Sequence, residues 1–180
     1  MKILLTGANG QLGREIFSSQ DQIKLSKSFE LIKTTKAEFN LLEIDKCVDF
    51  IKTNKPKLII NAAAYTAVDK AENEFNIANR INSHAINEIS KTLLETGGKI
   101  LHISTDYVFN GNQNLPYKTN SIRDPINSYG ISKANGEKSI ENILFPSQQG
   151  FILRTSWLMG PLGNNFALTM LDLMNKKENL

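Results

Sequence analysis

Five short apolar runs alternate with longer amphipathic segments along this chain of 180 residues. The runs cover residues 3–5, 31–32, 58–60, 100–103 and 151–153, and each has the length of a buried strand without the period of two typical of half-exposed strands. The segments that follow them predict helices over residues 11–20, 42–53, 82–95, 128–142 and 165–176. Strands that are each followed by a helix predict an α/β fold with a doubly wound parallel sheet, covered by helices on both faces.

Composition and charge exclude several kinds of protein. Apolar residues make up 41% of the chain and charged residues 22%, which supports a packed core and argues against disorder. The net charge of +3 is spread along the chain, so we expect no nucleic-acid partner. The longest uncharged apolar stretch, residues 58–68, is interrupted by Asn61 and Thr66 and falls short of the ~20 residues of a membrane span.

The beginning of the chain and its single cysteine bear on the compartment. A strand pattern starts at once in Met-Lys-Ile-Leu-Leu, which leaves no room for a signal peptide. Cys47 is the only cysteine, so no disulfide forms within the chain, and we interpret it as a small buried hydrophobe. We therefore expect a cytoplasmic protein without a membrane partner.

A glycine-rich turn links the first predicted strand to the first predicted helix. Gly7, Gly10 and Gly13 are spaced three apart, and small residues at such a turn let the backbone approach a pyrophosphate and let the helix pack against the sheet. The helix that follows offers free N–H groups and the positive end of its dipole to phosphates. The context predicts dinucleotide binding in a Rossmann-type fold; the alternative is a purely structural turn.

The residues after the second predicted strand bear on the choice between NADH and NADPH. NAD-binding proteins of this fold place an acid there to bind the ribose diol. Lys33 and Lys36 occupy this region instead, while Glu30 lies at the other end of the strand and Glu38 follows several residues later. We expect NADPH to be favoured with NADH tolerated; in the alternative interpretation both lysines are merely solvated.

A hydroxyl, a tyrosine and a lysine form the candidate catalytic set. Tyr129 and Lys133 lie four residues apart at the start of a predicted helix and therefore face the same side. A lysine cation beside a phenol favours the phenolate and lowers the pKa of the tyrosine towards a useful range. Thr105 or Ser104, at the end of the fourth predicted strand, could hold a substrate carbonyl. Such a Tyr/Lys pair alone is more often structural, but the glycine turn and the hydroxyls favour catalysis.

Residues 110–127 separate the hydroxyls from the tyrosine. This polar segment contains two prolines and no sustained period, so it predicts a long surface loop. Loops of such length are usually functional or disordered, and its place between two motifs favours a function.

These residues resemble the extended, nucleotide-sugar branch of the short-chain dehydrogenase/reductase superfamily. The segments at 61–72, 104–109, 129–137 and 154–157 closely resemble the dTDP-4-dehydrorhamnose reductase family, with Gly163-Asn164-Asn165-Phe166 near the end of the match. The resemblance implies reduction of the 4-keto group of dTDP-4-dehydro-β-L-rhamnose by NADPH or NADH, giving dTDP-L-rhamnose for cell-surface polysaccharide. It also implies a dTDP-sugar as partner and allows a homodimer.

The resemblance also assigns roles to residues. Tyr129 becomes the proton donor, Lys133 its tuner and ribose ligand, and Thr105 the substrate-orienting hydroxyl. Asp106 and Trp157 match sugar-contacting positions, although Asp106 could equally cap a turn and Trp157 could equally be a core or lid anchor. Asn40, followed by Leu41, stands where the family usually has an Asp, which weakens the expected hold on the adenine side. The implied cofactor-binding residues are Gly7, Gly10, Gln11, Leu12, Gly13, Asn40, Leu41, Ala64, Tyr65, Thr66, Ile103, Tyr129 and Lys133.

Several related functions are alternatives. Sugar-nucleotide 4,6-dehydratases place a Glu where this chain has Tyr107, and epimerases usually keep an acid after the second strand, so both are disfavoured. Another nucleotide-sugar 4-ketoreductase, or a non-catalytic NADP-binding protein similar to the regulatory subunit of methionine adenosyltransferase, stays open. No metal-ligand cluster is evident, because His84 and His102 are isolated; whether a divalent metal assists cannot be deduced from the sequence.

The length of the chain bears on its domains. We expect residues 1–180 to form an NAD(P)-binding Rossmann domain that carries the Thr/Tyr/Lys set. Chains of the family continue well beyond this length, so we expect the C-terminal substrate lobe to be largely absent and turnover by these residues alone to be doubtful.

Overall fold

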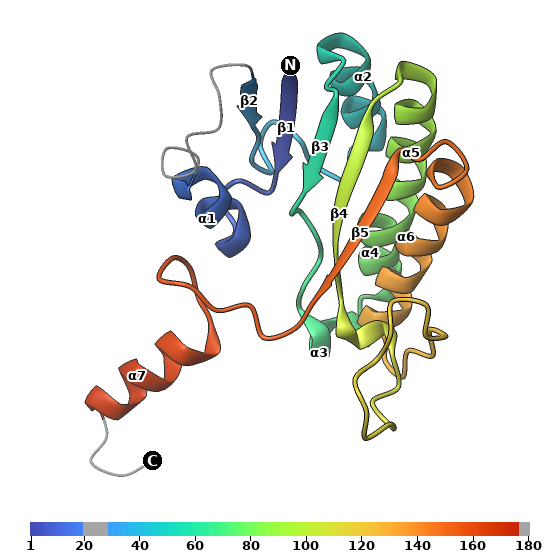
Figure 1. Cartoon of the computed structure of the whole chain (residues 1–180). Helices are drawn as coiled ribbons and strands as arrows, with labels where there is room; N and C mark the ends of the chain where they lie inside the picture. Colours follow the sequence, from blue (N-terminus) through green and yellow to red (C-terminus); the bar gives the residue numbers. More distant parts are fainter. Residues whose placement is uncertain (20–28, 177–180) are drawn as a thin grey trace.

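In the part of the chain that the structure describes, five parallel strands form the centre (Figure 1). The computed structural model of the chain describes residues 1–19 and 29–176. The strands lie in the order β2-β1-β3-β4-β5, so the chain turns back between β1 and β3. This confirms the predicted doubly wound parallel sheet and creates a switch point at the carboxyl ends of β1 and β3. The strands are β1 (Lys2–Thr6), β2 (Glu30–Lys33), β3 (Leu58–Asn61), β4 (Lys99–Thr105) and β5 (Gly150–Thr155).

The helices follow the strands as predicted, with shifted boundaries. They are α1 (Gln11–Ser19), α2 (Ile44–Asn54), α3 (Val68–Ala71), α4 (Phe75–Asn79), α5 (Ala85–Thr96), α6 (Ser128–Leu144) and α7 (Phe166–Lys176), with a π-helical turn at Arg80–His84 and a 3₁₀ turn at Asp106–Val108. The helix predicted over 82–95 begins earlier, because Ala78 is buried and α4 continues through the π-helical turn into α5. Similarly, α6 extends to Leu144, which is buried in the core. Gln20, the predicted end of α1, lies outside the described residues.

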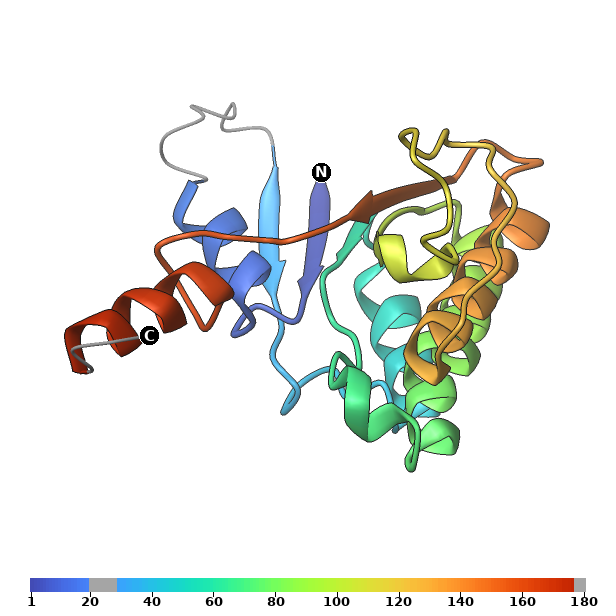
Figure 2. The same ribbon diagram turned by 90° about the horizontal axis from the view of Figure 1, so that it is seen from below.

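The main core lies between the sheet and the helices α2, α5 and α6, which Figures 1 and 2 show together on one face. Its fully buried side chains include Leu4, Ile51, Ile59, Ile86, Leu93, Ile100, Ile140 and Leu144. Cys47 is buried there as expected, and burial raises the pKa of its thiol to about 12. Its Sγ donates to the Asn40 carbonyl at 3.2 Å, which is consistent with a packing role.

The opposite face of the sheet is only partly covered by the described residues. Here α1 lies beside β1 and β2, whereas α7 lies away from the strands and buries none of its residues (Figures 1 and 2). On β5, Phe151 is 50% exposed and Leu153 is 49% exposed. The expectation that all strands are covered on both faces is therefore wrong for β5, because runs such as Phe-Ile-Leu do not show which face has a partner.

Candidate active site

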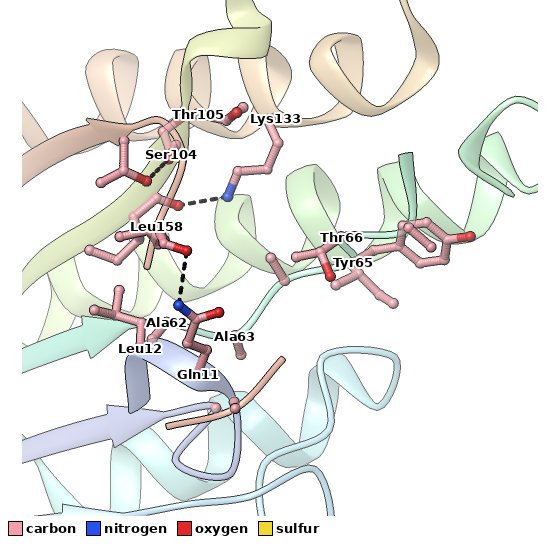
Figure 3. Close-up of a pocket in the computed structure, with 18 of the residues that line it drawn as sticks. Gln11, Leu12, Ala62, Ala63, Tyr65, Thr66, Ser104, Thr105, Lys133 and Leu158 are labelled. Carbon is pink, nitrogen blue, oxygen red and sulfur yellow. Dashed lines mark hydrogen bonds between the residues drawn. The ribbon is translucent and has the colours of Figure 1, made fainter. Parts of the chain in front are cut away.

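A cleft of about 970 Å³ lies at the carboxyl ends of β1, β3 and β4. It is therefore at the switch point, where open α/β sheets bind ligands. The glycine turn lines one part of it and the Thr105, Tyr129 and Lys133 side chains another, as Figure 3 shows in part. Of the predicted site residues, the cleft is lined by Gly7, Gly10, Gln11, Leu12, Asn40, Leu41, Ala64, Tyr65, Thr66, Ile103, Thr105, Asp106, Tyr129, Lys133 and Trp157. Gly13 alone among them does not line it.

The three glycines of the turn differ in what an added Cβ would contact. Gly7 has a φ of +67°, and a Cβ there would lie 2.8 Å from the Ala63 backbone nitrogen. A Cβ at Gly13 would overlap the carbonyl oxygen of Gly7, so this glycine lets α1 approach the turn. Gly10 is less crowded, with the nearest atom, the Gly7 oxygen, at 3.2 Å from an added Cβ. Since α1 begins at Gln11, the N–H groups of its first turn lie at the cleft.

The segment after β5 crosses the end of the cleft next to this turn. Gln11 Nε2 donates to the Leu158 carbonyl at 2.9 Å (Figure 3), and the Leu162 backbone N–H donates to Glu15 Oε1 at 2.9 Å. Trp157 lies in this segment with a φ of +51° and is 71% exposed, its ring packed edge-on against Phe166. The core-anchor alternative for Trp157 is therefore wrong; it lines the cleft on the solvent side.

The structure separates the two lysines near β2. Lys36 lines the main cleft, whereas the Lys33 ammonium lies over the Phe17 ring, 4.1 Å from its centroid, at a neighbouring hollow. Glu38 Oε2 accepts from the Thr35 backbone N–H at 2.7 Å and also from its hydroxyl. These bonds lower the pKa of Glu38. Arg14, one turn into α1, lines both the cleft and the hollow, a placement that sequence reasoning missed.

Asn40 uses its side chain locally. Its Oδ1 accepts from the Leu42 N–H at 3.1 Å, and its Nδ2 donates to Glu43 Oε1 at 3.0 Å. This arrangement is an Asx-type turn at the edge of the cleft, so the amide already has protein partners.

The end of β4 brings three polar side chains to the cleft. Thr105 caps the following 3₁₀ turn by accepting from the Tyr107 N–H at 3.2 Å, so Thr105 and not Asp106 is the cap. The Thr105 hydroxyl donates to Asp106 Oδ1 at 3.1 Å, and Asp106 Oδ2 accepts from Ser156 at 2.7 Å. The Tyr107 ring packs edge-on against Tyr129 with a centroid distance of 5.7 Å.

Tyr129 is positioned by the start of α6. Asn127 caps the helix by accepting from the Gly130 N–H at 2.7 Å, and Glu72 accepts from both the backbone and the hydroxyl of Ser128. Burial raises the pKa of Tyr129, and a hydrogen bond with Thr105 offsets part of the rise. The sequence-based expectation that Lys133 lowers the pKa of Tyr129 is therefore wrong, because burial raises that pKa and the amine is directed to other partners.

Those partners hold the Lys133 amine inside the protein. Its Nζ donates to the Ile103 carbonyl at 2.7 Å and lies 3.2 Å from His102 Nε2. Lys133 is only 1% exposed, and burial lowers the pKa of its amine to about 8, against a smaller opposing effect of Glu137. His102, expected to be an isolated strand residue, instead contacts the candidate catalytic lysine.

Two further groups escaped sequence reasoning. Asn82, in the π-helical turn, bonds the backbone N–H and carbonyl of Tyr65 at 2.9 and 3.0 Å and Ser132 at 3.0 Å. It thereby ties the loop after β3 to α6, while the Tyr65 hydroxyl donates to Glu74 at 2.7 Å. Figure 3 shows the Tyr65 ring directed away from Lys133, so mainly the backbone of Tyr65 faces the cleft. A π-helical turn often marks a functional site, but its sequence carries no clear signal.

The second group is a buried ion cluster behind Lys133. The Glu137 side chain is fully buried and accepts from Arg154 at 2.6 and 2.9 Å and from Arg123 at 2.9 Å. Although burial alone would raise the pKa of Glu137, these guanidinium groups hold it below its usual range. Arg123 lies in the predicted loop over 110–127, so the cluster fixes that loop to α6 and β5.

Comparison with known proteins shows what this chain is similar to. Over its full length the chain is 39% identical to dTDP-4-dehydrorhamnose reductase of Escherichia coli K12 and covers 59% of that protein. The crystal structure of a dTDP-4-dehydrorhamnose reductase from Clostridium acetobutylicum superposes on 98% of the chain with a TM-score of 0.88 and 39% identity. A dTDP-4-dehydrorhamnose reductase from Bacillus anthracis, solved in complex with NADP, gives a TM-score of 0.88 at 35% identity. The chain covers 60% of each of these two structures.

The share of the chain that a family model matches shows to which family the chain belongs. The chain spans about three fifths of the length of these relatives. Within residues 1–19 and 29–176, every helix is too short or too polar to span a bilayer. The family model described as RmlD substrate binding domain matches residues 1–180. The chain therefore belongs to the RmlD substrate binding domain family.

Proposed function

We propose that this chain binds NADPH and takes part in reducing the 4-keto group of dTDP-4-dehydro-β-L-rhamnose to dTDP-L-rhamnose. One observation carries the proposal: a single cleft contains both the glycine turn and the side chains of Thr105, Tyr129 and Lys133. Its position at the switch point of the sheet is the usual place for a nucleotide. In this proposal residues 1–180 form the cofactor-binding domain.

The residues present fit a dinucleotide. The Gly7 and Gly10 backbones and the first turn of α1 line the cleft where a pyrophosphate would need N–H donors and space. Lys36 and Arg14 supply positive charge near β2, which suits the 2′-phosphate of NADPH. Glu38 is bonded to Thr35 instead of facing the main cleft, which disfavours a ribose diol contact. We therefore propose NADPH as the preferred cofactor.

When bound, NADPH supplies the hydride for C4 of the keto sugar. The Tyr129 hydroxyl donates its proton to the carbonyl oxygen, which completes the alcohol. Its raised pKa keeps the phenol protonated until then. Thr105 lies beside Tyr129 and can hold the carbonyl in line. Asp106 and Trp157 line the same cleft, which supports the proposal that they contact the sugar.

Lys133 stabilises the phenolate that forms. An ammonium has three N–H donors; one is directed to the Ile103 carbonyl, and His102 Nε2 can accept a second when the ring proton is on Nδ1. Because Lys133 lines the cleft, we propose that its remaining N–H donates to a ribose hydroxyl or to the phenolate oxygen there. Charge on this amine thus supports proton donation by Tyr129.

The test combines binding with turnover. NADPH and NADH binding is measured by fluorescence titration, and NADPH oxidation is followed with dTDP-4-dehydro-β-L-rhamnose beside the UDP- and GDP-linked 4-keto sugars. We expect tighter binding of NADPH and oxidation with the dTDP-sugar. Tyr129→Phe should lower turnover by about 10²–10⁴ while NADPH affinity stays within twofold of the parent, about 0.4 kcal/mol or less.

Three results would contradict the proposal. Failure to bind either nucleotide would remove the cofactor assignment, and equal or weaker affinity for NADPH would remove the preference. Binding without oxidation of any keto sugar would favour a non-catalytic NADP-binding role. Near-normal turnover of Tyr129→Phe would remove this residue as proton donor.

A further inference from the structure

A line of buried polar side chains leads across the sheet to Lys133. Thr6 on β1, Asn61 on β3 and His102 on β4 are register neighbours in adjacent strands, so their side chains share one face. The Thr6 hydroxyl donates to Asn61 Oδ1 at 2.6 Å, Asn61 Nδ2 lies 2.9 Å from His102 Nδ1, and His102 Nε2 lies 3.2 Å from Lys133 Nζ. None of the four side chains is more than 1% exposed.

The donors and acceptors in this line depend on the charge of Lys133. The Asn61 amide nitrogen only donates, so in the observed arrangement His102 Nδ1 accepts and the ring proton is on Nε2. A neutral Lys133 amine can accept from that Nε2–H. An ammonium can only donate, and then Nε2 must accept and the ring proton must be on Nδ1.

The second arrangement is also available to these residues. Rotation of the Asn61 amide would direct Oδ1 to the Nδ1–H of His102 and Nδ2 to the Thr6 oxygen. In this orientation the Thr6 oxygen accepts from Asn61 Nδ2 beside the Ala63 N–H, from which it already accepts at 3.4 Å, so Thr6 changes from donor to acceptor towards Asn61. Each charge state of Lys133 therefore has its own arrangement in which His102 is bonded through both nitrogens.

We propose that His102 is a positioning residue for Lys133, which keeps the amine in place in both charge states by exchanging its ring tautomer while staying neutral. When Nζ releases one proton to the cleft, the ring keeps a single proton, which changes from Nδ1 to Nε2. The importance of this device for reduction rests on the proposed function of Lys133. The device itself rests only on the contacts of the four side chains.

The charged groups around the pair are consistent with a neutral ring. Burial, with the Lys133 charge adding to it, lowers the pKa of His102 well below its usual range. Glu137, on the same side of α6 one turn on, favours the Lys133 ammonium, and Arg154 and Arg123 neutralise its carboxylate. His102 can therefore accept from the ammonium without competing for its proton.

The tautomer can be measured without any activity. Long-range ¹H–¹⁵N NMR distinguishes the two ring nitrogens, and the chain has two histidines, of which exposed His84 is the internal reference. From about pH 6 to about pH 10, we expect His102 to carry one proton throughout, on Nδ1 at low pH and on Nε2 at high pH. The midpoint should coincide with that of the Lys133 side-chain carbon signal, and in Lys133→Met the tautomer should not change with pH.

Two outcomes would overturn the proposal: a doubly protonated His102 at about pH 6, or an unchanged tautomer while Lys133 titrates. Variants give a second readout. His102→Phe removes the bond in both charge states, but the bond from the charged ammonium is the stronger one, so the Lys133 midpoint should fall by about one pH unit. His102→Gln keeps a polar group that can donate or accept and should shift the midpoint less than half as far. Equal midpoints in all three proteins would also overturn it.

A measurement of activity distinguishes a failure of this proposal from a failure of the proposed function. If the chain reduces the keto sugar, the alkaline limb of its pH–rate profile should move to lower pH in His102→Phe and little in His102→Gln. Absence of turnover would count against the proposed function and leave the NMR outcome to decide the role of His102.

Discussion

Removal of the Lys133 charge should change how the stability of the protein depends on pH. Burial lowers the pKa of this amine from 10.5 to about 8, a difference of about 2.5 pH units. At about 1.4 kcal/mol per unit, the buried ammonium destabilises the fold by about 3 kcal/mol at neutral pH. Between the two pKa values the unfolded chain binds more protons than the folded one, so stability should rise with pH in this window. From pH 7 to pH 9.5 the Lys133 contribution to this rise is about 2 kcal/mol.

Urea unfolding of the parent and of Lys133→Met at several pH values in this window checks the prediction. The methionine has no charge, so the rise of about 2 kcal/mol should be missing from its profile. Lys57→Met, which removes an exposed ammonium, is the matched control and should keep the parent profile. Parallel profiles for the parent and Lys133→Met would refute the argument that the ammonium is buried at a cost. The absolute difference at pH 7 is less informative, because the methionine leaves the His102 ring without its partner.

Three further predictions concern the ion cluster, the glycine turn and the cofactor preference. Glu137→Gln should lower the free energy of unfolding by about 3 kcal/mol in urea, because two guanidinium groups lose a fully buried partner. Glu141→Gln, whose side chain is 31% exposed, should cost less than about 1 kcal/mol, and equal costs would contradict the buried cluster. Because the pKa of Glu137 is depressed, its contribution is present at neutral pH and should be lost as the pH falls through that pKa. Gly13→Val should lower the melting temperature far more than Gly10→Val, because a Cβ at Gly13 overlaps the Gly7 carbonyl. Gly10→Val should stay folded and lose NADPH binding. The reverse order of the two melting temperatures would contradict this prediction. Lys36→Ala should weaken NADPH binding about tenfold and leave NADH binding unchanged in parallel titrations, and an equal loss for both nucleotides would place this lysine away from the 2′-phosphate.

The strands and the glycine turn could be predicted because their signals are local. Short apolar runs of strand length, each followed by an amphipathic segment, indicate parallel strands whatever their order, and all five runs lie within the observed strands. Glycine at position 7 reflects a backbone φ of +67°, a constraint that is visible in the residue type itself. Helix ends were less accurate, since the start of α4 and the end of α6 depend on burial against other elements.

The candidate site has features that local sequence patterns do not predict. The spacing of Tyr129 and Lys133 predicts the pair, but it does not show in which direction the amine points. For that reason it also does not show whether the pKa of Tyr129 is raised or lowered. Lys133 on α6 and His102 on β4 are 31 positions apart, and their contact depends on how this helix packs against the sheet. No spacing within either segment predicts that contact.

The sequence by itself therefore determined the fold class, the order of the elements and the residue types at the cleft, since periodicity, turn chemistry and helical spacing act over a few residues. Tertiary structure alone decided which polar side chains are buried together, which face of β5 the described residues leave exposed and which charges neutralise one another. The physical reason is that desolvation and hydrogen-bond partnership depend on surroundings assembled from distant segments. In this chain those surroundings turn an isolated histidine on β4 into the partner of the candidate catalytic lysine.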